Sequence, residues 1–259
     1  MTTLAIRASN ATRPNERFSA SPTRGSEGNA GWLRRTGATD GILLLGGSSA
    51  ADLRLRSAQA PVRSDLTPSH WSLAGILVGA DTFLSVPLET TADVSAIPSN
   101  NGIRECRVAD YDDAIRYPNI AWLVFAAEGT AIRDAARRVG AHRALVDIPA
   151  LIVAWLSHVW GVDDCNPLAS GKGIPSAAFV QAAHHAANIE LTPGLASGSS
   201  CPEAIWQTAK WWQDYYADSA RVAAAAPRAP GHAAAAVPSG AYLVRQSFTG
   251  GAAKAVAGA

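Results

Sequence analysis

Apolar and polar residues change their spacing about half-way along this chain of 259 residues. The first half contains short apolar runs, some alternating with polar positions, separated by glycine, proline and polar stretches. Short runs with a period of two are typical of strands. They predict a five-stranded, largely antiparallel sheet, with strands at 40–45, 70–78, 82–89, 103–108 and 120–125.

In the second half the apolar residues recur at helical spacing. The pattern predicts four helices: an amphipathic one at 130–139, a nearly all-apolar one at 147–160, one that starts at Pro175, and one that starts with the capping-box spacing of Ser200 and Glu203. Proline is tolerated in the first turn of a helix, so Pro175 fits the start of the third one. Strands followed by helices predict the α+β class.

The two ends of the chain differ in composition from its centre. Residues 1–36 are rich in small polar residues and arginine and show no apolar period, so we expect a flexible arm. Residues 220–259 are rich in alanine, proline and glycine, so we expect a tail in which 241–245 could form one short strand. The folded domain is therefore expected at 37–219.

The composition argues against two classes of partner. A formal net charge of +1 gives no basic surface for nucleic acid. The most apolar run, 148–156, is too short to span a bilayer, so no integral membrane segment is expected. The first residues lack the features of a secretory signal. We therefore expect a cytoplasmic protein, or one exported by a route that needs no N-terminal signal peptide. The oligomeric state is left open.

The cysteines and histidines do not show metal-ligand spacing. Cys106, Cys165 and Cys201 include no CxxC pair, which argues against a zinc site and against a disulfide framework. His142 and His158 also have no partner at ligand spacing. We expect neither a metal nor a cofactor.

Three residues have the order that nucleophilic catalysis needs. His70 stands at the start of a predicted strand, Glu89 at the end of the next, and Ser176 in the first turn of a helix. A nucleophile at a helix N-terminus, a base and a group that orients the base form such a site. Each residue also has a structural explanation: a helix cap for Ser176, a local hydrogen bond for His70, and a solvated strand end for Glu89.

Other candidates are weaker. Cys201 is a rival nucleophile, because the start of a helix should lower the pKa of its thiol. His184 and His185 lie in mid-helix and are expected to be core or surface residues. The late tryptophans are expected to pack the last helix on the sheet, or alternatively to line a cleft: Trp206, Trp211 and Trp212.

Several short stretches follow one another in a distinctive order. They are Asp-Gly-Ile-Leu-Leu at 40–44, Ser69-His70 before a strand of the pattern hxGIxxG, Leu88-Glu89, Gly102-Ile-Arg with Tyr111 after it, Pro-Ser-Ala-Ala-Phe-Val at 175–180, and Ala-Asn-Ile-Glu-Leu-Thr-Pro-Gly at 187–194. In this order, the span 38–194 resembles the circularly permuted papain-like amidohydrolases, the YiiX-like branch of the NlpC-type cysteine peptidase superfamily.

The resemblance implies a permuted papain-like fold, in which about five mostly antiparallel strands form a sheet or half-barrel and helices follow. It implies a nucleophile at position 176, with His70 as base and Glu89 as the orienting group. The family nucleophile is a cysteine, whereas this chain has Ser176. A thiol of lowered pKa is already a thiolate, but a serine must lose its proton during attack. We therefore expect an inactive site, either engineered or naturally silent.

Two functions are compatible with these observations. The first is a thiol-hydrolase-like amidase or acyltransferase acting on a peptidoglycan peptide, an isopeptide or a lipid ester, as in a bacterial effector or toxin. The second is a non-catalytic papain-like binding module for a peptide or partner protein, with Ser176 as the native residue. A hydrogen bond between Ser176 Oγ and the His70 ring, with Glu89 on the other side of the ring, would favour the first.

Overall fold

The structure is a computed structural model and describes residues 28–88, 101–125, 129–142, 146–225 and 243–248. The helices are α1 (Asn29–Thr36), α2 (Ala50–Ala58), α4 (Gly129–Ala141), α5 (Ile148–Val159), α6 (Pro175–Ala186) and α7 (Pro202–Ala225). The strands are β1 (Ile42–Gly46), β2 (Leu73–Leu77), β3 (Thr82–Ser85), β4 (Arg104–Arg107), β5 (Asn119–Val124) and β6 (Leu243–Phe248). Short 3-10 turns are η1 (Ala60–Val62), η3 (Val108–Tyr111), η4 (Pro167–Ser170) and η5 (Ser197–Ser199).

The strands form one six-stranded sheet in the order β4-β3-β2-β1-β5-β6, and every pairing is antiparallel. The five predicted strands are present, and a sixth, β6, lies at the edge beside β5 and overlaps the short strand considered at 241–245. The strand predicted at 70–78 begins only at Leu73, so His70 precedes β2 instead of lying in it. Together with the helices, this sheet confirms the α+β class.

The central strand β1 is buried on both of its faces. Ile42 and Leu44 point into the core under the long helices, whereas Leu43 and Leu45 point into a second core on the other face of the sheet. This double burial explains why 42–45 reads as an unbroken apolar run instead of alternating with polar residues. The sheet must therefore be covered on both sides.

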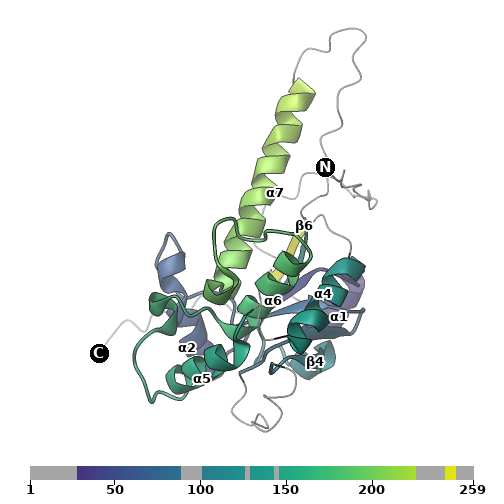
Figure 1. The fold of residues 1–259 in the computed structure, drawn as a ribbon. Helices are drawn as coiled ribbons and strands as arrows, with labels where there is room; N and C mark the ends of the chain where they lie inside the picture. Colours follow the sequence, from purple (N-terminus) through teal and green to yellow (C-terminus); the bar gives the residue numbers. More distant parts are fainter. Residues whose placement is uncertain (1–27, 89–100, 126–128, 143–145, 226–242, 249–259) are drawn as a thin grey trace, which may run out of the picture.

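The larger core lies between the sheet and helices α4 to α7 (Figure 1). Helix α6 packs against β2 and α4, and its residues from Pro175 to His184 are all buried. Helix α7 starts against this layer and then extends away from the body (Figure 1). The predicted helix starts at Pro175 and near Ser200 agree with the starts of α6 and α7.

The other face of the sheet is covered partly by α1, within the segment predicted to be a flexible arm. That prediction was wrong for residues 29–36, which form a helix with Trp32 and Leu33 buried in the second core. The amide of Asn29 donates hydrogen bonds to the carbonyls of Tyr111 at 2.6 Å and Tyr117 at 3.1 Å. The helix is thus stabilised by residues about eighty positions away, which a local pattern cannot reveal.

A second unpredicted helix, α2, lies in the polar stretch after β1. Ser49 caps it through a reciprocal capping box with Asp52. Leu55 and Ala58 pack with Trp155, Val159, Ile174 and Cys201 in a small third core between α2, α5 and the starts of α6 and α7. Helix α2 therefore docks against α5 as part of the domain.

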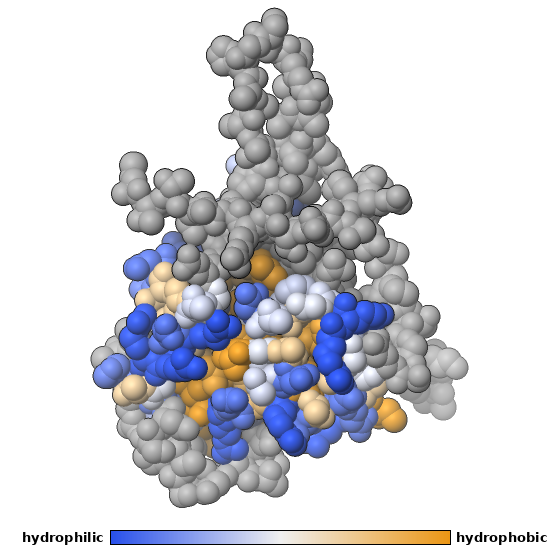
Figure 2. All heavy atoms as spheres, turned by 90° about the vertical axis from the view of Figure 1, so that its right-hand side faces the viewer, coloured by the Kyte–Doolittle hydropathy of each residue, from blue (hydrophilic) through white to orange (hydrophobic). Residues whose placement is uncertain are grey.

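Large apolar side chains reach the surface mainly along α2, η1 and α5, in the residues just after them, and on α7. They are Leu53, Val62, Leu66, Val153, Trp160, Val162, Trp211 and Tyr215. On the side of α1 and α4, hydrophilic residues surround an area of apolar atoms (Figure 2). Among the described residues, the surface around α2 and α5 is thus a place to look for binding.

Replacing Leu33 tests whether α1 is part of the folded core. Leu33 is fully buried, so we expect Leu33→Ala to lower the free energy of unfolding by about 3 kcal/mol. Chemical denaturation followed by circular dichroism measures this. The control is Ile115→Ala, at a side chain that is 86% exposed, which should change stability by less than about 0.5 kcal/mol. Equal small effects would mean that α1 does not dock.

Candidate functional site

Ser176 lies in the first turn of α6 and faces the sheet. Its side chain is only 1% exposed, and its Oγ accepts a hydrogen bond from the main-chain N–H of Ala74 in β2 at 3.2 Å. No side-chain cap bond is formed at the start of α6, so Ser176 does not cap its own helix. Instead, its hydroxyl oxygen satisfies a buried amide of the strand and ties α6 to β2.

The strand residues level with Ser176 carry no ionisable group. They are Leu73, Ala74 and Gly75, and Gly75 is held against β3, where an added Cβ would lie 2.4 Å from the Phe83 ring. His70 comes four residues before Ala74, outside the strand. Its carbonyl accepts a hydrogen bond from the Asn119 side-chain amide at 3.0 Å, which fixes this part of the backbone beside the start of β5.

Several charged side chains act on the half-buried ring of His70, unlike the strand residues beside Ser176. Burial lowers its pKa, Arg63 and Arg56 lower it further, and Glu203 and Asp65 act in the opposite direction. The ring is therefore neutral at pH 7 and lies among groups of the 63–71 segment and the start of α7. Glu89, the predicted third member, lies outside the described residues.

At the centre of this charged group, Glu203 is fully buried. One of its oxygens accepts from the Ser69 hydroxyl at 2.6 Å, and the other accepts from Gln207 at 2.6 Å and from Arg63 at 3.3 Å. Its main-chain N–H donates to the Gln59 side chain at 2.9 Å. The Glu203 network thus joins α2, the loop before β2 and the first turn of α7.

The second partner of Arg63 lies at the surface. Asp65 forms a two-bonded ion pair with the Arg63 guanidinium at 2.9 and 2.7 Å. The pKa of the Asp65 carboxyl is held well below its usual range, first by the hydrogen bond from Arg63 and then by the main-chain N–H of Thr67. Arg63 therefore bridges one buried and one half-exposed carboxylate, which is an arrangement suited to structure.

Cys201 does not have the properties of a nucleophile. We expected the start of a helix to lower its pKa, but its thiol is 1% exposed and burial raises the pKa to about 12. Desolvation of a thiolate here outweighs the hydrogen bonds from the main chain of the helix. The thiol remains protonated and packs in the third core with Ile174 and Trp155.

His184 is a buried histidine on the same helix as Ser176. Its Nδ1 lies 2.8 Å from the carbonyl of Val180, and the Phe125 ring packs edge-on at 6.4 Å. Burial lowers the pKa of His184 from 6.5 to about 4. The ring is neutral at pH 7 and acts as a core residue, as one of the two sequence interpretations had it, whereas His185 is exposed.

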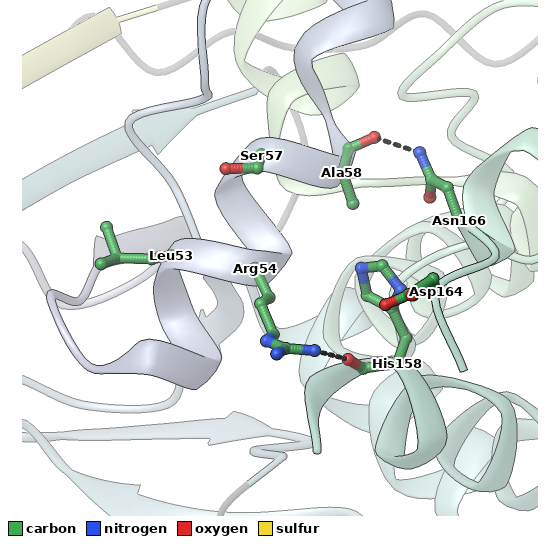
Figure 3. Close-up of a pocket in the computed structure, with 7 residues that line it drawn as sticks. All are labelled: Leu53, Arg54, Ser57, Ala58, His158, Asp164 and Asn166. Carbon is green, nitrogen blue, oxygen red and sulfur yellow. Dashed lines mark hydrogen bonds between the residues drawn. The ribbon is translucent and has the colours of Figure 1, made fainter. Parts of the chain in front are cut away.

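An open cavity lies between α2 and the end of α5 (Figure 3). Its volume is about 460 Å³, and it is lined by Leu53, Arg54, Ser57, Ala58, His158, Asp164 and Asn166. This cavity was not predicted from the sequence, because α2 was not predicted and the two walls lie about a hundred positions apart. The only local signal was the Ser49–Asp52 capping box, which would have predicted α2.

Metal binding and membrane spanning can be judged for the described residues. Within them, no group of three or more His, Cys, Asp or Glu side chains is placed to hold a metal ion. None of their helices combines the length and apolarity that crossing a bilayer requires.

Comparison with known proteins does not assign the chain to a family. No family model, curated protein or solved structure matches it. The function must therefore be inferred from the residues and their geometry.

Changing the buried carboxylate tests the Glu203 network. We expect Glu203→Gln to lower the free energy of unfolding by about 2 to 3 kcal/mol, because it removes a charge that Arg63 faces in a buried setting. Asp65→Asn makes the same chemical change on the half-exposed side of Arg63 and should cost less than about 1 kcal/mol. Urea denaturation of both variants measures the difference; a larger loss for Asp65→Asn would contradict this assignment.

His184 predicts a pH dependence of stability. Between pH 6.5 and about 4 the unfolded chain binds a proton that the folded chain does not, so stability must fall as pH falls through this window. The full effect of this residue is about 3 kcal/mol. Denaturation curves at several pH values should show a smaller loss for His184→Gln than for the unchanged chain. His185→Gln changes an exposed site and should keep the original pH dependence of stability. If His185→Gln removed that pH dependence, the assignment to His184 would be refuted.

Proposed function

We propose that this chain is a non-catalytic papain-like domain that binds a peptide or a partner protein. The observation that carries the proposal is the environment of Ser176. The hydroxyl is buried, and its oxygen accepts from the main-chain N–H of Ala74. A nucleophile must offer its oxygen to the substrate and its proton to a base. Ser176 offers its oxygen to the protein itself.

The surroundings of His70 support the same proposal. The charged groups that act on its pKa are Arg63, Arg56, Glu203 and Asp65, and this set includes the buried Arg63–Glu203 pair, which joins three segments of the fold. A histidine at this place is explained by its structural setting. It does not need a catalytic role.

The competing proposal is a hydrolase or acyltransferase for amide or ester bonds, such as peptidoglycan peptides, isopeptides or lipid esters, in a bacterial effector or toxin. It keeps position 176 as nucleophile, His70 as base and Glu89 as orienting group. The order of His70 and Ser176 in the chain, and the start of α6 against β2, favour it. It requires a thiol at position 176 to become accessible and activated.

The variant Ser176→Cys separates the two proposals. We expect it to show no turnover of soluble peptidoglycan stem peptides, isopeptide-linked peptides or p-nitrophenyl esters, like the unchanged chain. We also expect iodoacetamide to alkylate the new thiol at pH 7 at least about tenfold more slowly than free cysteine, since a buried thiol is protonated and shielded. Mass spectrometry of the alkylated protein measures this rate.

Cys165 is exposed, so the labelling is done in a Cys165→Ser background, and thermal unfolding verifies that the variant is folded. Turnover by Ser176→Cys, or alkylation faster than that of free cysteine, would overturn the non-catalytic proposal and favour the hydrolase. Turnover by the unchanged chain that Ser176→Ala abolishes would make Ser176 itself the nucleophile.

A further inference from the structure

The cavity between α2 and α5 has the size of a small-ligand site. Its volume of about 460 Å³ lies within the range of roughly 300 to 1,000 Å³ found for small-molecule sites. Two of its lining residues, Leu53 and Ala58, are apolar and lie apart on α2, and the remaining lining residues are polar or charged (Figure 3). Ser176 is not among the residues that line this cavity. A ligand site here therefore goes beyond the function proposed above.

Arg54 is held in a fixed place at this cavity. Its Nη1–H donates to the carbonyl of His158 at 3.0 Å (Figure 3). The guanidinium also lies against the backbone of Gly161, where an added Cβ would come 2.5 Å from both terminal nitrogens. Gly161 has φ +71°, so it tolerates this geometry as other residues do not. The other N–H donors of Arg54 have no partner among the described residues.

The opposite charge in the same cavity is Asp164. In the described part of the chain, no ion pair joins the Asp164 carboxylate to Arg54, although both line the cavity. His158 adds an acceptor: its Nδ1 lies 3.1 Å from the Cys165 carbonyl, which can only accept, so in the neutral ring Nε2 carries no proton. The cavity thus combines a cationic donor group, an anionic acceptor group and an imidazole ring.

We propose that this cavity binds a small zwitterion that carries both a free amino group and a free carboxylate, as a short peptide or an amino acid does. The carboxylate binds the free N–H donors of Arg54, since guanidinium and carboxylate form strong charge-assisted hydrogen bonds. The amino group binds Asp164, and an apolar side chain lies on Ala58. Each charge of the ligand meets an opposite charge of the protein, and among the described residues neither Arg54 nor Asp164 forms an ion pair.

Isothermal titration calorimetry with alanyl-leucine tests this on the full chain. We expect saturable binding, weakened about tenfold or more by amidating the carboxylate and likewise by acetylating the amino group, because each change removes a charge-assisted hydrogen bond. Free leucine is the second probe: binding as tight as that of the dipeptide identifies an amino-acid site, and weaker binding identifies a peptide site.

The variants assign each end of the ligand. Arg54→Gln should bind the acid and the amide of the dipeptide equally, and Asp164→Asn should bind the free and acetylated amines equally. Arg54→Lys should keep part of the preference for the acid. The matched controls, Arg137→Gln and Asp134→Asn on α4, lie in a surface ion pair away from the cavity and should leave every affinity unchanged.

Absence of saturable binding by alanyl-leucine up to roughly 10 mM, which corresponds to a very weak site, would overturn the proposal. Preferences that persist in Arg54→Gln and Asp164→Asn would also overturn it. Neither result bears on Ser176→Cys, because that variant is read out by turnover and alkylation. Failure of this proposal and failure of the non-catalytic proposal are therefore distinguishable.

Discussion

The structure depends on the burial of β1 from both sides. Its side chains alternate between two cores: Ile42 and Leu44 enter one, and Leu43 and Leu45 enter the other. Neither face of the sheet at β1 can therefore be left to solvent. Each buried apolar side chain is worth on the order of 2 kcal/mol, and this favours any segment that covers either face. Helix α6 covers one face, and α1 covers part of the other even though its own sequence is largely polar.

This constraint also determines what the start of α6 can do. A helix packed tightly on β2 buries its first turn, and a buried strand amide at Ala74 then needs an acceptor. Ser176 supplies that acceptor. A hydroxyl oxygen that accepts from a main-chain N–H stabilises the contact of helix and sheet. The start of α6 is thus a point of attachment between the helix and β2.

The elements with a clear period were predictable, and those stabilised by distant residues were not. The five strands β1 to β5 and the helices α4 to α7 follow from their own apolar spacing. Helix α1 depends on the hydrogen bonds of Asn29 to Tyr111 and Tyr117, and no local pattern encodes them. The position of Ser176 at a helix start was predictable from Pro175, but its partner is a main-chain amide, which leaves no signal in the sequence. Glu203, recognised only as part of a helix cap, is the centre of the buried network.

Two arginine–carboxylate arrangements in this fold show the difference between structure and binding. Arg63 and Glu203 are buried and paired, because an isolated charge in that setting would be very costly. Arg54 and Asp164 lie at an open cavity, where water lowers the cost of leaving charges unpaired. In the described part of the chain neither of these two side chains forms an ion pair, so both can gain from a ligand that brings the opposite charges. For this reason the surface between α2 and α5, rather than the start of α6, is where we expect recognition to occur.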